Sequence, residues 1–95
     1  MKAFSVDLSP ITEKYKIVFS DEVYSYFSGI NFAGRIPARV LGLSFCDYLR
    51  FARDVHNATI CGKTGYPYLV FEDKKNAQKL ADLLNLYWVK GNKNL

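Results

Sequence analysis

The stretch Pro37-Ala38-Arg39-Val40-Leu41-Gly42-Leu43-Ser44 decides how the middle of the chain folds. Proline fits the first turn of a helix, where its missing N–H leaves no hydrogen bond unmade. Gly42 is suited to end that short helix in a left-handed conformation. Ser44 then caps a second helix, with Asp47 at the third position as a short capping box. The stretch therefore predicts two helices joined by a tight glycine turn.

The second helix is predicted to bury one face, because apolar residues recur every three or four positions after Ser44. The residues on this face are Phe45, Tyr48, Leu49, Ala52 and Val55. The opposite face carries Asp47, Arg50, Arg53 and Asp54. Asn57 is suited to a left-handed helix end.

The residues before this corner predict a hairpin and another helix. Alternating apolar residues over 4–8 and 11–19 indicate two paired strands, separated by Ser9-Pro10. Ser20 followed by two acidic residues is typical of a helix start, and Gly29 is expected to end that helix. Residues 31–35 are expected to form a loop.

The residues after the corner predict a second hairpin and a long helix. Strands over 59–63 and 66–72 flank Thr64-Gly65, and Pro67 favours a sheet edge or an irregular strand start. Asp73 caps a helix that ends at Gly91, leaving 91–95 as a short tail. Its predicted buried stripe comprises Ala77, Leu80, Ala81, Leu84, Tyr87 and Trp88. Its predicted solvent-facing positions are Lys75, Gln78, Lys79, Asp82 and Asn85.

These elements predict an α+β fold in one domain spanning 1–95: an N-terminal β-hairpin, three helices including a helix-turn-helix-like corner, a second β-hairpin and a C-terminal amphipathic helix. With 95 residues, 49% of them hydrophobic, the chain can bury one core. The two cysteines give no disulfide framework, and neither a signal peptide nor a membrane-spanning run is visible. We expect a cytoplasmic protein.

All four arginines fall between positions 35 and 53, in a chain of net charge +4. The guanidinium fork matches phosphate geometry. The predicted nucleic-acid or phosphate-binding residues are Arg35, Arg39, Arg50, Arg53 and Lys63. Tyr66 and Tyr68 flank Pro67 beside the Lys63 turn, where they are candidates for stacking on bases. The alternative is a solvated surface on which Asp47 pairs with Arg50 and Asp54 dilutes the charge.

The stretch from Ala38 to Ser44 resembles the core of a helix-turn-helix, with a small residue in the first helix and a glycine in the turn. The hairpin over 59–72 occupies the place of the wing in a winged helix. The resemblance implies binding to DNA or RNA. The alternative is an ordinary corner of two helices inside an α+β core.

The sequence gives no sign of catalysis, so we expect a non-enzymatic protein without cofactor or metal. No paired-carboxylate motif occurs. Cys46 and His56 are ten residues apart on one predicted helix, about 15 Å along its axis. The segment Gly62-Lys63-Thr64-Gly65 lacks the upstream glycine of a P-loop and joins two strands.

Two other functions remain open at this point. A small domain with many aromatic residues also suits a phage-type accessory or inhibitory protein that binds another protein. Arginine and tyrosine together would also suit a pocket between subunits for a small phosphorylated ligand or nucleotide signal. Leu83 and Leu86 widen the apolar stripe of the last helix, which predicts a homodimer through these residues.

Overall fold

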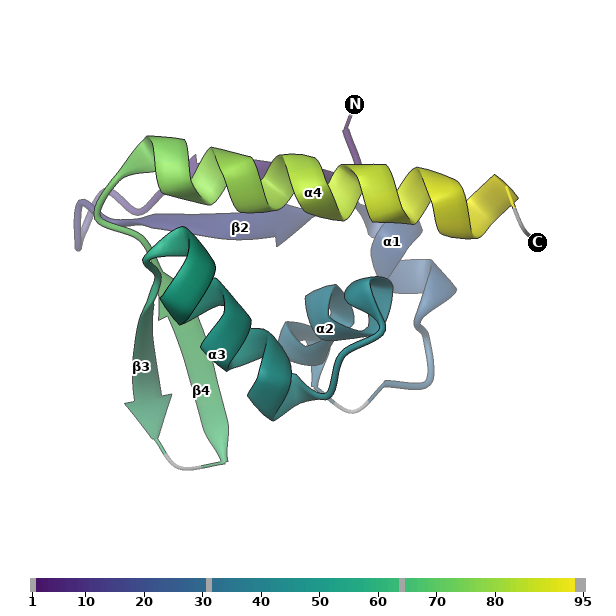
Figure 1. Ribbon diagram of the computed structural model, residues 1–95, viewed down its shortest axis with the longest axis horizontal. Coiled ribbons are helices and arrows are strands. Elements are labelled where there is room, and N and C mark those ends of the chain that lie inside the picture. Colours follow the sequence, from purple (N-terminus) through teal and green to yellow (C-terminus); the bar gives the residue numbers. More distant parts are fainter. Residues whose placement is uncertain (1, 31, 64, 94–95) are drawn as a thin grey trace.

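The computed structural model describes residues 2–30, 32–63 and 65–93 and confirms the predicted α+β class (Figure 1). An N-terminal hairpin is followed by three short helices, a second hairpin and a long C-terminal helix that packs on the first hairpin. The elements are β1 (Phe4–Leu8), β2 (Tyr15–Phe19), α1 (Asp21–Tyr26), the 3-10 helix η1 (Ala33–Arg35), α2 (Ile36–Leu41), α3 (Phe45–His56), β3 (Thr59–Lys63), β4 (Tyr66–Val70) and α4 (Lys74–Lys93).

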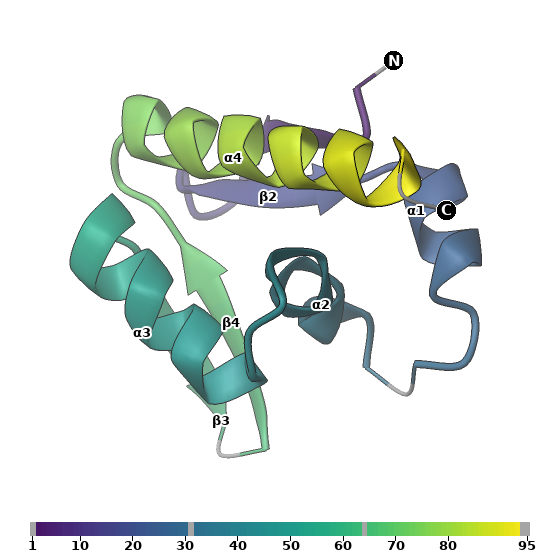
Figure 2. The same ribbon diagram turned by 45° about the vertical axis from the view of Figure 1, so that its right-hand side comes forward.

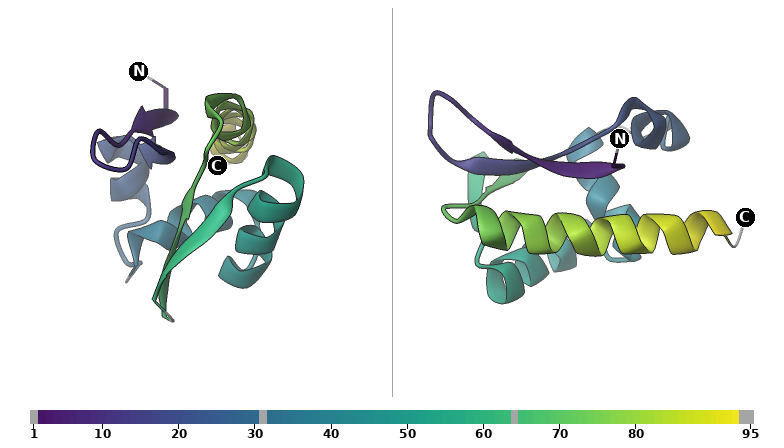
Figure 3. Two further views of the ribbon diagram at one scale, coloured as in Figure 1. Left: turned by 90° about the vertical axis from the view of Figure 1, so that its left-hand side faces the viewer. Right: turned by 90° about the horizontal axis from the view of Figure 1, so that it is seen from above.

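The two hairpins meet at a single point. In the first, β1 and β2 are antiparallel, and in the second, β3 and β4 are antiparallel with Lys63 opposite Tyr66. An isolated bridge joins Tyr15 at the start of β2 to Phe71 just after β4. The second hairpin extends away from the first beyond this bridge (Figures 1 and 3). This divergence leaves the facing edges of β2 and β4 unpaired with each other.

Helix α4 covers the core of the molecule. It runs along the first hairpin, and α2 and α3 pack against it and against each other (Figures 2 and 3). The largest fully buried side chains are Phe4, Phe71, Ile36, Leu80, Leu84 and Val23. Among the described residues, no helix has the length and apolar character needed to cross a membrane.

The predicted end of the first helix in the central corner and both ends of the second are confirmed, whereas the first helix begins at Ile36, one residue before the predicted start at Pro37. Pro37 lies in the first turn of α2, and Gly42 ends that helix with a φ of 71°. The Ser44 hydroxyl accepts a hydrogen bond from the Asp47 amide at 3.1 Å. Asn57 ends α3 with a φ of 55°, as a left-handed cap should. Each signal acts over a few residues, which is why the sequence shows it.

Several predicted boundaries near the hairpins are wrong. Ile11 is 92% exposed in a turn, because the chain reverses there and β2 begins only at Tyr15. Helix α1 ends at Tyr26 rather than Gly29, and part of the expected loop over 31–35 is the 3-10 helix η1. Strand β4 ends at Val70 instead of residue 72. Thr64, in the predicted hairpin turn, and Asn31, in the predicted loop, lie outside the described residues.

Two apolar residues predicted to be buried are exposed. Val55 is 64% exposed, and His56 is buried in its place, because the residues of α3 that face the core follow a spacing of four: Tyr48, Ala52 and His56. On α4, Tyr87 is 43% exposed.

The polar side and the end of α4 also differ from the prediction. Asn85 was expected to face solvent but is partly buried against β1. The helix continues through Gly91 to Lys93 rather than ending at the glycine, which helices tolerate at a cost of about 1 kcal/mol. Of the predicted tail over 91–95, residues 94–95 lie outside the described part of the chain.

Candidate nucleic-acid interface

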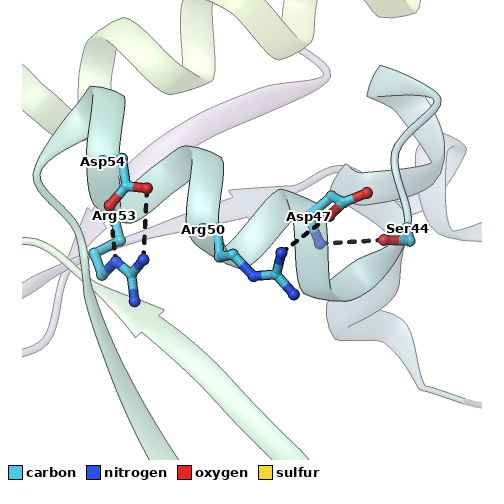
Figure 4. Close-up of polar contacts among 5 residues, drawn as sticks. All are labelled: Ser44, Asp47, Arg50, Arg53 and Asp54. Atoms are coloured by element: carbon cyan, nitrogen blue, oxygen red, sulfur yellow. Dashed lines mark hydrogen bonds and ion pairs between the residues drawn. The ribbon is translucent and has the colours of Figure 1, made fainter.

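The arginines on α3 are paired with acidic neighbours. Arg50 lies 3.6 Å from the Asp47 carboxylate, and the Arg53 Nε donates to Asp54 at 2.9 Å. Figure 4 shows both arginine side chains leaving the same side of the helix. The hydrogen bond from Arg53 lowers the pKa of the Asp54 carboxyl, so that acid stays charged. The four formal charges cancel, and this side of α3 offers little net attraction for phosphate.

The other two arginines lie before and within α2. Arg35 ends η1, and its Cζ lies 5.6 Å from the centre of the Phe45 ring, a cation–π distance. Arg39 is exposed one helical turn further on. Within residues 2–30, 32–63 and 65–93, neither side chain forms an ion pair. Their charge is therefore available to a ligand.

Phe32 connects this arginine pair to the second hairpin. Its ring packs edge-on against Phe45, with centroids 5.8 Å apart, and against Tyr66 at 5.7 Å. A Cβ atom at Gly34 would lie 2.8 Å from the Phe32 ring, so glycine lets the ring occupy this position. Sequence reasoning missed Phe32, although a large aromatic residue inside an expected loop was a usable signal.

The hairpin contributes the remaining groups. Tyr66 is 71% exposed, although its ring is in T-shaped contact with the Phe32 ring. Lys63 stands directly opposite Tyr66 in the β3–β4 register and is exposed. We call Phe32, Arg35, Phe45, Lys63 and Tyr66 the Phe32 surface. It brings together three of the predicted site residues: Arg35, which lies just before α2, and Lys63 and Tyr66, which lie in the second hairpin.

The other predicted site residues lie elsewhere. Tyr68 follows Tyr66 by two positions and pairs with Cys61 across the hairpin, so it shares the face of Tyr66 but lies nearer the first hairpin. On α4, Leu83 packs against the core and is only partly exposed, whereas Leu86 is 50% exposed. Leu86 alone of that pair is therefore free for a partner, and the homodimer stays a prediction.

The cysteines and the single histidine of the chain lie at differently exposed positions. Cys46 is exposed and Cys61 is half-buried. No three His, Cys, Asp or Glu side chains gather as metal ligands within the described ranges. His56 is buried, and its Nε2 atom has no hydrogen-bond partner. Burial lowers the pKa of the His56 imidazole, with a further contribution from the charge of Lys79.

Comparisons of the chain with protein-family models, with curated proteins and with solved structures find no match.

Proposed function

We propose that this protein is a non-enzymatic, cytoplasmic binder of single-stranded nucleic acid and that the Phe32 surface is its binding site. The observation that carries the proposal is the packed row of Arg35, Phe45, Phe32 and Tyr66, which ends in a largely exposed tyrosine ring. Aromatic platforms beside cations are how proteins hold unpaired bases and the adjoining phosphates.

The two parts of the surface would have different tasks. The exposed Tyr66 ring offers a face for a base, and such stacking contributes about 1–3 kcal/mol per base. Arg35 and Lys63 of this surface, together with Arg39 one helical turn beyond Arg35, provide positive charge for the phosphates of the nucleic acid. With three cations in contact, the logarithm of the binding constant should fall with the logarithm of salt concentration with a slope of about −2.

The charges on α3 favour single strands over duplex. A helix that enters the major groove needs its outward face to attract phosphates and contact base edges. The outward face of α3 instead carries Arg50 and Arg53 already paired with aspartates (Figure 4). Arg35 and Lys63, which form no ion pair within the described residues, lie beside the aromatic rings, where a single strand can reach both.

Fluorescence anisotropy with a labelled oligothymidine, and with a duplex of equal length, tests the proposal across a salt series. We expect Tyr66→Ala to weaken single-strand binding roughly 5- to 100-fold through the loss of one stacked base. Arg35→Ala should weaken binding and flatten the salt dependence. Tyr66→Phe, which keeps the ring, and Arg53→Ala, which removes a paired arginine, are the matched controls and should bind nearly as the wild type does.

Circular dichroism of each variant establishes that it is folded. No binding of the oligothymidine at low salt would contradict the proposal. Equal losses from Arg53→Ala and Arg35→Ala would contradict the assigned surface, and tighter binding of the duplex would favour the helix-turn-helix arrangement instead.

A further inference from the structure

A groove opens where the two hairpins diverge. The amide and carbonyl of Tyr15 exchange hydrogen bonds of 2.9 and 2.8 Å with those of Phe71, and this bridge joins the two hairpins beside the groove. Beyond it, β2 forms one wall and β4 the other, without pairing between them. Residues of α2 and α3 form the floor. Three parts of the fold, which are β2, β4 and the corner formed by α2 and α3, thus define the groove before any ligand arrives.

The size and lining of the groove suit a small molecule. Its volume is about 520 Å³, inside the range of roughly 300–1,000 Å³ typical of ligand sites. Apolar side chains from β2, β4, α2 and α3 line most of the groove: Ile17, Phe19, Pro37, Phe45, Leu49 and Leu69. Such a lining favours an apolar ligand body, whose burial contributes about 25 cal/mol per Å².

The charged groups of the groove are all basic. Lys14 and Lys16 line the β2 wall, and none of the described lining residues is acidic. Lys14 is engaged by Glu72 just outside the groove, at 2.9 Å. Asp7 stands opposite Lys16 in the β1–β2 register but is not within ion-pair distance of it. Lys16 is therefore the cation left for a ligand.

We infer that this groove binds a small amphipathic monoanion, with an apolar body between β2 and β4 and a single carboxylate at Lys16. One unpaired ammonium group matches one negative charge. A nucleotide polyphosphate would bring several charges to a groove that none of the four arginines lines. The groove shares Phe45 with the Phe32 surface, but Tyr66 and Lys63 do not line it.

The two cysteines provide a direct test, because Cys61 lines the groove and Cys46 is exposed outside it. Alkylation of each thiol by N-ethylmaleimide is followed by mass spectrometry with decanoate or decylamine present. Saturating decanoate should slow modification of Cys61 at least tenfold and leave Cys46 unchanged. Decylamine, of equal chain length and opposite charge, should give no protection.

A pair of charge variants locates the carboxylate. Lys16→Glu should weaken protection by decanoate about tenfold or more, since a charge-assisted contact is replaced by repulsion. Lys75→Glu makes the same change in net charge on α4, outside the groove, and should leave protection unchanged. Circular dichroism confirms that both variants are folded.

Three results would overturn the inference. One is the absence of Cys61 protection by decanoate at any concentration that leaves the protein folded. Another is equal protection by decanoate and decylamine, which would show that the groove does not select an anion. The third is protection of Cys61 that rises with protein concentration without ligand, which would show that a second copy of the chain occupies the groove.

Discussion

His56 is the residue whose environment departs furthest from what its type suggests. It is 9% exposed, packs edge-on against Phe51 with centroids 5.1 Å apart, and leaves Nε2 without a hydrogen bond. Burial and the positive charge of Lys79 both favour the neutral imidazole. Its pKa in the folded protein is therefore below the ordinary value of 6.5.

This lowered pKa predicts a loss of stability in mild acid. Above the ordinary pKa both states are neutral, and the contribution of His56 is fully present. As the pH falls below 6.5, the unfolded chain takes up a proton that the folded protein resists, so the free energy of unfolding decreases. We expect the free energy of unfolding, measured by urea unfolding, to be lower at pH 5.5 than at pH 7.

The chain has a single histidine, so His56→Gln should remove most of this dependence above the range where carboxylates titrate. If the free energy of unfolding falls by the same amount in the wild type and in His56→Gln as the pH is lowered from 7 to 5.5, this account is refuted.

At the scale of elements, local capping signals set the ends of α3. The helix begins at the Ser44 cap and ends where Asn57 adopts a φ of 55°. The Ala58 amide then donates to the Ala52 carbonyl at 3.0 Å, so the first amide after Asn57 has a hydrogen-bond partner in the last turns of the helix. Asparagine tolerates this left-handed conformation better than most residues.

Replacing Asn57 tests the importance of that conformation. Asn57→Ala should lower the free energy of unfolding by about 1 kcal/mol, because alanine's Cβ disfavours the left-handed region. Asn57→Gly should stay within a few tenths of a kcal/mol of the wild type, because glycine adopts the conformation freely. Thermal and urea unfolding of the two variants give the comparison. Equal destabilisation would mean that the Asn57 side chain matters and its backbone conformation does not.

At the scale of the whole molecule, one side chain ties the C-terminal helix to the first strand. The Asn85 Oδ1 accepts from the Phe4 amide at 2.7 Å, and its Nδ2 donates to the Phe4 carbonyl at 2.9 Å. The two residues are 81 positions apart, and the contact holds the hairpin against α4 (Figure 3). Phe4 is fully buried, so water does not easily replace these bonds.

Asn85→Ala should therefore lower the free energy of unfolding by about 2 kcal/mol, because two backbone groups lose their partner. Gln78→Ala is the matched control on the same helix: the Gln78 amide bonds Asp82 at 2.9 Å on the exposed side. Its loss should change stability by less than about 0.5 kcal/mol. Urea unfolding measures both, and hydrogen exchange at the Phe4 amide should accelerate in Asn85→Ala alone. Similar effects of the two changes would contradict the structural role of Asn85.

The sequence by itself determined the order and type of the strands and α-helices, though not the 3-10 helix η1. Gly42, Ser44 and Asn57 act through hydrogen bonds and backbone conformations within a few residues, so their effects are visible in a linear chain. The clustering of all four arginines between positions 35 and 53 was visible in the same way. The sequence did not show which arginines form ion pairs, because it offered Asp47 and Asp54 only as possible partners.

The tertiary structure alone decided which distant residues meet. The Tyr15–Phe71 bridge, the contact of Phe32 with Tyr66 and the bond of Asn85 to Phe4 each join segments far apart in the chain. Polarity misled the prediction for Asn85, and no prediction placed His56 in the core, because a polar side chain can be buried where packing requires it. Both the Phe32 surface and the groove depend on the angle between the two hairpins, which the packing of all the elements sets and no short stretch of sequence encodes.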